Sequence, residues 1–243
     1  MTLAAVLVAA AAYGKGVRLL SGRGDGWPWQ RSAAALVAAV CLGLAVAGPV
    51  ADDAGSFRVH VVQHLLLATA APLALAVASP VLLALRTLPA RPRRVLLAVV
   101  RSRVARWATS PGVALVAAAG GTWAYYLTPV YPYTERHPVV HALVHGHMLL
   151  AGCLLTWCVL APAPSPSRPL PVRLVTLAVA AGSHDVMAKL MYVHRLPAEP
   201  GVGAGAQLLW YAGDALEVLT AVVALASWYA AAGRRLRHAT VPG

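Results

Sequence analysis

Seven long apolar stretches constrain this chain more than any other feature of its sequence. They lie at 2–14 (extending to 20), 32–50, 57–85, 111–129, 137–161, 171–194 and 205–231. A helix needs about 20 apolar residues to cross the hydrocarbon core of a bilayer. We therefore predict an all-α, polytopic membrane protein whose residues 1–243 form a single domain of seven transmembrane helices. A soluble enzyme is excluded, because only 12% of the residues are charged, about half the usual share.

The basic residues are divided unevenly between the segments that join these stretches. Sixteen of the twenty lie in or flank the loops after the first, third and fifth stretches and the segment after the seventh. Only Arg58, Arg136 and Arg195 lie on the other side, and Lys189 lies within the sixth stretch. Since cytoplasmic loops are rich in Lys and Arg, we predict an N-terminus outside and a C-terminus inside. Bases dispersed over four segments are not a nucleic-acid-binding face, so the expected partner is the lipid bilayer.

Histidines gather on the opposite side of the predicted membrane, which holds or adjoins eight of the nine. His60 and His64 are spaced i, i+4 at the start of the third stretch, and His137, His141 and His145 repeat that spacing in the fifth. This spacing places the imidazoles on one face of a helix, where two of them can bind one ion. At about 1.5 Å per residue, His64 and His145 reach similar depths, so the two sets meet if these helices pack together.

Ionisable side chains inside a bilayer are costly and therefore indicate function. Hydrogen bonding to a neighbouring helix explains one isolated histidine, but two i, i+4 series on the same side favour a metal or haem site. His147 is offset by two positions from His145 and is predicted to point elsewhere. His194, at the end of the sixth stretch, is predicted to be solvated.

The sixth and seventh stretches carry further polar and sulfur-containing residues. His184, Met187 and Met191 form one stripe on a helix, and imidazole with thioether suits copper. Core packing by the methionines is the other interpretation, and the sequence leaves both open. Three carboxylates lie near the middle of these stretches and are predicted to pair with Lys189, to orient histidines or to relay protons: Asp185, Asp214 and Glu217.

Several segments resemble the multi-spanning CtaG family. The third stretch carries His60-Val-Val-Gln63-His64, then Ala71-Pro72-Leu73 and Ser79-Pro80. The fifth carries His137-Pro138 and then His141, His145, His147 and Met148, and the last carries Gln207, Trp210, Gly213 and Asp214. The residues that match its histidine segments are His60, His64, His137, His141, His145 and His147. The residues 201–206 depart from the family, which often has an acidic residue and Gln before its last span.

The resemblance implies a role in the assembly of cytochrome c oxidase, with copper handled at the extracytoplasmic face. We expect a non-enzymatic factor in a bacterial plasma membrane that binds copper and delivers it to an oxidase subunit or receives it from a copper chaperone. The expected copper ligands are His60, His64, His137, His141, His145, His184 and Met187. Two other functions stay open: a haem-binding membrane oxidoreductase and an ion or proton-coupled transporter.

Overall fold

The computed structural model describes residues 2–47, 56–164 and 168–239. Within these ranges the chain forms helices and no strand, as the apolar stretches predict. In chain order the helices, with two π-helical turns, are α1 (Leu3–Gly22), α2 (Trp29–Val46), α4 (Phe57–Leu65), η1 (Leu66–Ala70), α5 (Ala71–Ala78), α6 (Pro80–Thr87), α7 (Ala90–Val100), α8 (Arg103–Ala108), α9 (Pro111–Leu115), η2 (Val116–Gly120), α10 (Gly121–Leu127), α11 (Val130–Glu135), α12 (Pro138–Leu160), α13 (Leu170–His194) and α14 (Val202–Ala239).

Among the described residues, six helical segments are long and apolar enough to cross a membrane, where the sequence predicted seven. They are α1, α2, the run Phe57–Thr87, α12, α13 and the Val202–Arg235 part of α14. The predicted span at 111–129 corresponds to α9, η2 and α10, which hold 5, 5 and 7 residues. At 1.5 Å per residue this run is about 26 Å long, which is less than the hydrocarbon core of about 30 Å.

The other predicted boundaries agree with the helices to within a few residues, except at the C-terminal end. α1 continues to Gly22 without a break at Gly14 or Gly16. α14 begins at Val202 and extends to Ala239, well past the predicted end at residue 231. The predicted second span reaches residue 50, and its last residues lie outside the described ranges.

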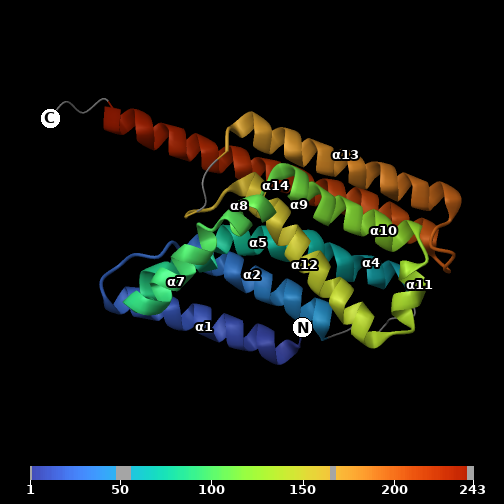
Figure 1. Ribbon diagram of the computed structural model, residues 1–243, viewed down its shortest axis with the longest axis horizontal. Coiled ribbons are helices and arrows are strands. Elements are labelled where there is room, and N and C mark those ends of the chain that lie inside the picture. Colours follow the sequence, from blue (N-terminus) through green and yellow to red (C-terminus); the bar gives the residue numbers. More distant parts are fainter. Residues whose placement is uncertain (1, 48–55, 165–167, 240–243) are drawn as a thin grey trace.

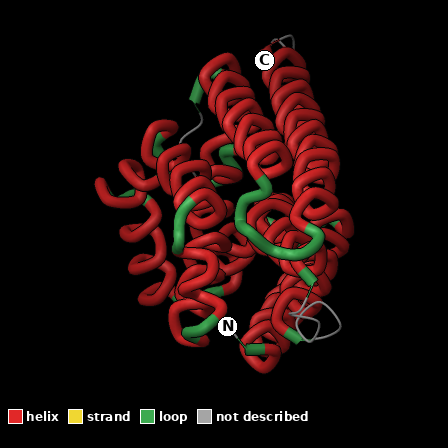
Figure 2. Tube along the Cα trace, turned by 90° about the vertical axis from the view of Figure 1, so that its right-hand side faces the viewer, coloured by secondary structure: helices red, strands yellow, loops and turns green. Residues whose placement is uncertain are grey.

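The run Phe57–Thr87 occupies the centre of the bundle. Half of its most apolar window is buried, against 11–39% for the other five segments. α2, α12 and α14 pack against it, α1 packs on α2 and α6, and α13 lies along α14 (Figure 1). Figure 2 shows the same bundle from the end at which α11 and the α13–α14 loop lie. α7 and α8, where arginines are concentrated, lie toward the opposite end.

A proline causes the irregularity of this central run. Pro72 has no N–H, and its ring displaces the carbonyl four residues earlier, that of Ala68 in η1. The displaced oxygen faces α12 at Gly152, where an added Cβ would collide with it and would lie 2.9 Å from Pro72 Cγ. Glycine at this position therefore lets the backbones of α12 and the central run come into contact.

A buried arginine connects the start of α13 to the end of α12. Arg173 of α13 is only 4% exposed, and its guanidinium donates hydrogen bonds to the carbonyls of Val159 and Leu160 at the end of α12. Helix C-termini leave such carbonyls without partners, and a basic side chain satisfies them well. The sequence counted Arg173 only as a basic residue of the loop, and the structure gives it this second role.

We predict that Gly152→Ala destabilises the protein by about 1–3 kcal/mol, the usual effect of an overpacked contact. The matched control is Gly146→Ala in the same helix, because a Cβ at Gly146 meets nothing within 4 Å. Alanine favours helix over glycine by about 0.5–1 kcal/mol, so the control should be neutral or stabilising. Thermal unfolding in detergent measures both variants, and equal unfolding temperatures would contradict the close contact.

Candidate functional site

Four histidines from two helices meet in one place. α4 contributes His60 and His64, and α12 contributes His141 and His145. The ring centroids of His60 and His64 are 4.1 Å apart, and those of His141 and His145 are 4.2 Å apart. Between the helices, His64 Nε2 lies 3.3 Å from His145 Nε2. The i, i+4 spacing places each pair on one helix face, and the packing of α12 on the central run brings the two faces together.

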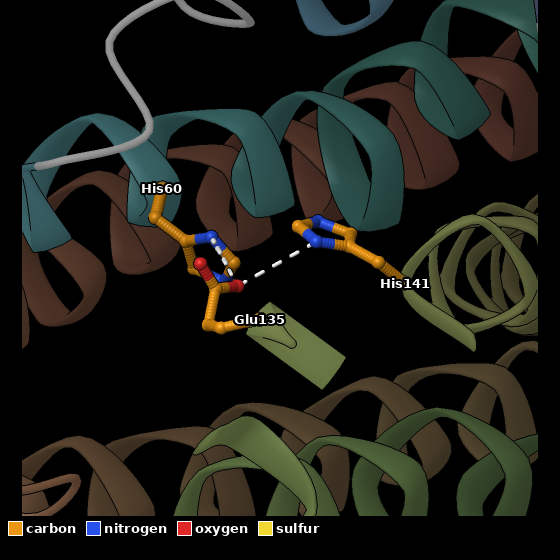
Figure 3. A group of neighbouring side chains, drawn as sticks. All are labelled: His60, Glu135 and His141. Atoms are coloured by element: carbon orange, nitrogen blue, oxygen red, sulfur yellow. Dashed lines mark ion pairs between the residues drawn. The ribbon is translucent and has the colours of Figure 1, made fainter. Parts of the chain in front are cut away.

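Glu135, the last residue of α11, adds a carboxylate to this group. Its Oε1 lies 3.9 Å from His60 Nδ1 and 3.5 Å from His141 Nδ1. Figure 3 shows its carboxylate directed toward both rings. One ligand atom from each of these three residues lies within 4.8 Å of the others, so the three can hold a metal ion. We call the five residues His60, His64, Glu135, His141 and His145 the histidine cluster.

Burial and nearby charges act on Glu135 in opposite directions. Burial raises the pKa of this carboxyl above its usual range, His141 lowers it, and the Glu199 carboxylate raises it further. Burial has the larger effect. A carboxylate in such a place is stabilised by any cation that it contacts.

Three tyrosines enclose the histidines. Tyr125 and Tyr126 of α10 are each 1% exposed. Tyr125 Oη lies 3.0 Å from His60 Nε2, and Tyr126 Oη lies 2.5 Å from His64 Nδ1. Tyr131 of α11 packs edge-on against His60, with 5.1 Å between ring centroids. The two hydroxyl groups give His60 Nε2 and His64 Nδ1 hydrogen-bond partners and orient these two rings.

Sequence reasoning missed Glu135 and the tyrosines as parts of the site. The expected ligands included neither this carboxylate nor the hydroxyl groups. A signal was present, since Glu135 lies two residues before the second histidine segment and Tyr125-Tyr126 lies near the end of a predicted span on that side. A polar aromatic pair at the histidine-rich end of a span is a reasonable candidate for ordering buried imidazoles.

Exposure decreases inward through the histidine cluster. The side chains of Glu135 and His141 are 28% and 24% exposed, whereas that of His60 is 5% exposed. His64, one turn further along α4, is 3% exposed. The cluster therefore has an accessible mouth, formed by Glu135 and His141, and a closed interior.

The structure does not bring every predicted ligand into the cluster. His137 is exposed at the start of α12, where its Nδ1 lies 2.8 Å from the Tyr133 carbonyl oxygen. His147 points elsewhere, as its offset predicts, with Nε2 3.1 Å from the Ala117 carbonyl oxygen. His194 is exposed at the end of α13. Only the face of α12 that carries His141 and His145 turns toward α4.

The polar residues of α13 and α14 form a separate group. His184 Nδ1 lies 3.3 Å from Glu217 Oε1. Asp185 Oδ2 lies 3.5 Å from Lys189 Nζ, and Asp214 is close enough to interact with Asp185, Glu217 and His184. We call His184, Asp185, Asp214 and Glu217 the α13–α14 cluster.

The two methionines of α13 are fully buried. Met187 and Met191 are each 0% exposed and belong to the hydrophobic cluster between α4, α10, α12, α13 and α14. Met187 also lines a cavity of about 100 Å³, together with His64, His184 and Glu217. This cavity therefore lies between the histidine cluster and the α13–α14 cluster.

Comparison with known proteins gives a family match over most of the chain. A family model described as cytochrome c oxidase caa3 assembly factor (Caa3_CtaG) matches residues 11–231. The uncharacterized proteins Mb0105 of Mycobacterium bovis and MT0111 of Mycobacterium tuberculosis are each 29% identical over 273 residues, which cover 97% of this chain. The uncharacterized protein ML1998 of Mycobacterium leprae is 29% identical over 153 residues, 60% of this chain and 23% of its own length.

The chain spans 40% of the length of the first two of these relatives. No solved structure matches. The family match includes both histidine-bearing helices, α4 and α12, and the α10–α11 segment that encloses their imidazoles. The chain belongs to the cytochrome c oxidase caa3 assembly factor family.

Proposed function

We propose that this protein is a non-enzymatic assembly factor that binds copper at the histidine cluster and delivers it to cytochrome c oxidase. Membership of the family supports the oxidase as the partner. The convergence of four imidazoles and one carboxylate from α4, α11 and α12 supports the metal, and it is the observation that carries the proposal. Imidazole ligands accept copper in either common oxidation state, which suits transfer.

The geometry suggests how the ion is held. His60, Glu135 and His141 supply donor atoms at the accessible mouth. His145 Nε2 lies 2.9 Å from His141 Nε2 and 3.3 Å from His64 Nε2, and nitrogens that share one tetrahedral ion are also about 3.3 Å apart, given bonds of about 2.0 Å. An ion bound at the mouth therefore has further nitrogens directly beneath it, and we propose that it moves inward from one set to the other.

The same packing favours a bare ion over haem. The imidazoles and tyrosines are in mutual contact, and the cavity beside His64 has about 100 Å³. Pockets for organic ligands of moderate size have about 300–1,000 Å³. No space for a macrocycle separates the histidine rings of the two helices within the described residues.

The proposal includes the orientation of the chain. We propose that Pro111–Leu127 crosses the bilayer as a seventh span, tilted little because it is short, in a bacterial plasma membrane. The N-terminus of the protein and the histidine cluster then face outward. The arginines of α7 and α8 face the cytoplasm, as the positive-inside rule requires. The mycobacterial relatives support a bacterial membrane.

We predict that the double variant His60→Ala/His141→Ala loses high-affinity copper binding. It removes two ligands, so the affinity for copper should fall by more than the roughly 10–100-fold typical of losing one residue that hydrogen-bonds to a ligand. Copper titration of the purified protein in detergent measures this. The matched control is His137→Ala, because His137 lies on α12 but faces the Tyr133 carbonyl. Equal losses in both variants, or none in the double variant, would contradict the ligand assignment.

We also predict that Tyr126→Phe lowers copper affinity about 10–100-fold while the number of bound ions stays the same. The variant removes the hydroxyl that contacts His64 Nδ1 and leaves the ring in place. Tyr133→Phe is the control, since the exposed Tyr133 ring stacks on His137 outside the cluster. If the affinity of Tyr126→Phe equals that of the wild type, the tyrosine does not orient the ligand.

The orientation has its own test in intact cells. In a chain whose three cysteines are replaced by alanine, Ala198→Cys in the α13–α14 loop and Ala90→Cys at the start of α7 are both exposed. A membrane-impermeant maleimide should label the first and label the second only after the cells are opened. The reverse pattern would show that the protein is inverted, and labelling of both would refute an odd number of spans.

A further inference from the structure

The α13–α14 cluster contains buried polar atoms that no described residue satisfies. They are His184 Nδ1, Asp185 Oδ1 and Glu217 Oε2. His184 lies ten residues before His194 at the end of α13, which places it about 15 Å along the helix. Unsatisfied polar atoms at such a depth cost several kcal/mol each in hydrocarbon. A group of them therefore indicates something that this chain binds rather than ordinary core packing.

His184 and Glu217 have the separation of two ligands of one ion. Nδ1 and Oε1 are 3.3 Å apart, yet His184 Nδ1 makes no hydrogen bond. Donor atoms that share a tetrahedral ion at about 2.0 Å are also separated by about 3.3 Å. The side chains are 17% and 16% exposed, so both atoms lie inside the protein but remain close to a cavity.

The charges of the cluster also call for a cation. Lys189 pairs with Asp185, is 48% exposed, and lies 4.3 Å over the ring of Trp210. Among the described residues, no Lys or Arg forms an ion pair with Asp214 or Glu217. Carboxylates without a counter-charge are strongly disfavoured within a bilayer. An ion bound between His184 and Glu217 would supply that charge.

The packing of α13 on α14 holds the imidazole in place. Gly213 of α14 lies beneath the His184 ring, and an added Cβ there would collide with it. The ring is therefore fixed by close contact with the α14 backbone, one turn before Glu217. Pre-arranged ligands of this kind are typical of binding sites, because their side-chain entropy is lost during folding rather than on binding.

The cavity joins this cluster to the histidine cluster. Its lining includes His64 at one site and His184, Met187 and Glu217 at the other. A volume of about 100 Å³ holds roughly three waters at about 30 Å³ each. A partly hydrated ion therefore fits between the two sites.

From this geometry we infer that His184 and Glu217 bind a second transition-metal cation, distinct from the one proposed at the histidine cluster. This second site lies at the inner end of the shared cavity. Imidazole is a borderline ligand that accepts Cu²⁺ or Zn²⁺, and a carboxylate oxygen also serves as a ligand of Zn²⁺. Where the proposed function holds, this second position lies on the path that copper takes from the mouth into the membrane. The site itself rests on its own residues and does not require delivery to an oxidase.

The test is the number of Cu²⁺ ions that the purified full chain retains in detergent, with an electron paramagnetic resonance spectrum of each form. We expect two ions for the wild type, one for His184→Gln, one for His60→Ala/His141→Ala, and none for the combined variant. The ion kept by His60→Ala/His141→Ala should show coupling to a single imidazole nitrogen. His194→Gln on the same helix is the control and should retain two.

Each outcome separates the two proposals. If His60→Ala/His141→Ala still loses one ion but His184→Gln loses none, the histidine cluster stands and the second site is refuted, with a proton shared between His184 and Glu217 as the explanation. If the histidine variants lose nothing while His184→Gln loses one, the proposed function fails and the second site stands. An ion retained by the combined variant refutes both assignments.

Two further variants keep the test independent of folding. Glu217→Gln preserves the shape of the side chain and should lose the same ion. Gly213→Ala should displace the His184 ring and lower the affinity of the second site about tenfold or more without removing a ligand, while the first site is unchanged. Wild-type binding at both sites in these two variants, with normal thermal unfolding, would also overturn the inference.

Discussion

The need to satisfy polar groups without water governs this structure. Inside a bilayer a buried imidazole or carboxylate must find its partners within the protein. The histidines of α4 and α12 find them in one another, in Tyr125 and Tyr126, and in Glu135. The tyrosines and Glu135 come from the segment α9 to α11, whose run Pro111–Leu127 is shorter than any of the six candidate spans. That segment therefore matters to the site through its tyrosines and its carboxylate more than through its length.

The two polar clusters use different means of balancing charge. The histidine cluster contains four imidazoles in mutual contact and one carboxylate at its accessible edge. The α13–α14 cluster has three carboxylates against one lysine and leaves buried atoms without partners. The first is close to complete without an ion, whereas the second is not. A cation that moves inward along the cavity would meet increasingly negative surroundings.

Periodicity in the sequence predicted much of this architecture. The length of the apolar stretches predicted the helices. The i, i+4 spacing predicted the pairs His60–His64 and His141–His145, which share a face because a helix repeats every 3.6 residues. The same rule included His137, which the structure leaves out because it precedes the first turn of α12. Glu135 and the tyrosines escaped prediction because the sequence shows only that they lie near the histidine segments, whereas their contacts depend on how α10 and α11 fold back over α4. The sequence also indicated the polar residues of the α13–α14 cluster, but it did not show which of them pair. The packing of α13 on α14 decides which carboxylate meets His184.

The π-helical turn at Leu66–Ala70 sets the angular relation between the two halves of the central run. A π turn carries an extra residue, and each residue advances a helix by about 100°. The face that α4 turns toward α12 is thus not fixed by the face that α5 turns toward α2. If the same number of residues formed a regular α-helix, the extra residue would advance the helix by about 100° and turn both imidazoles away from α12 by roughly a quarter of a circle. The wide turn of this short segment therefore matters more to the site than the identity of most of its side chains.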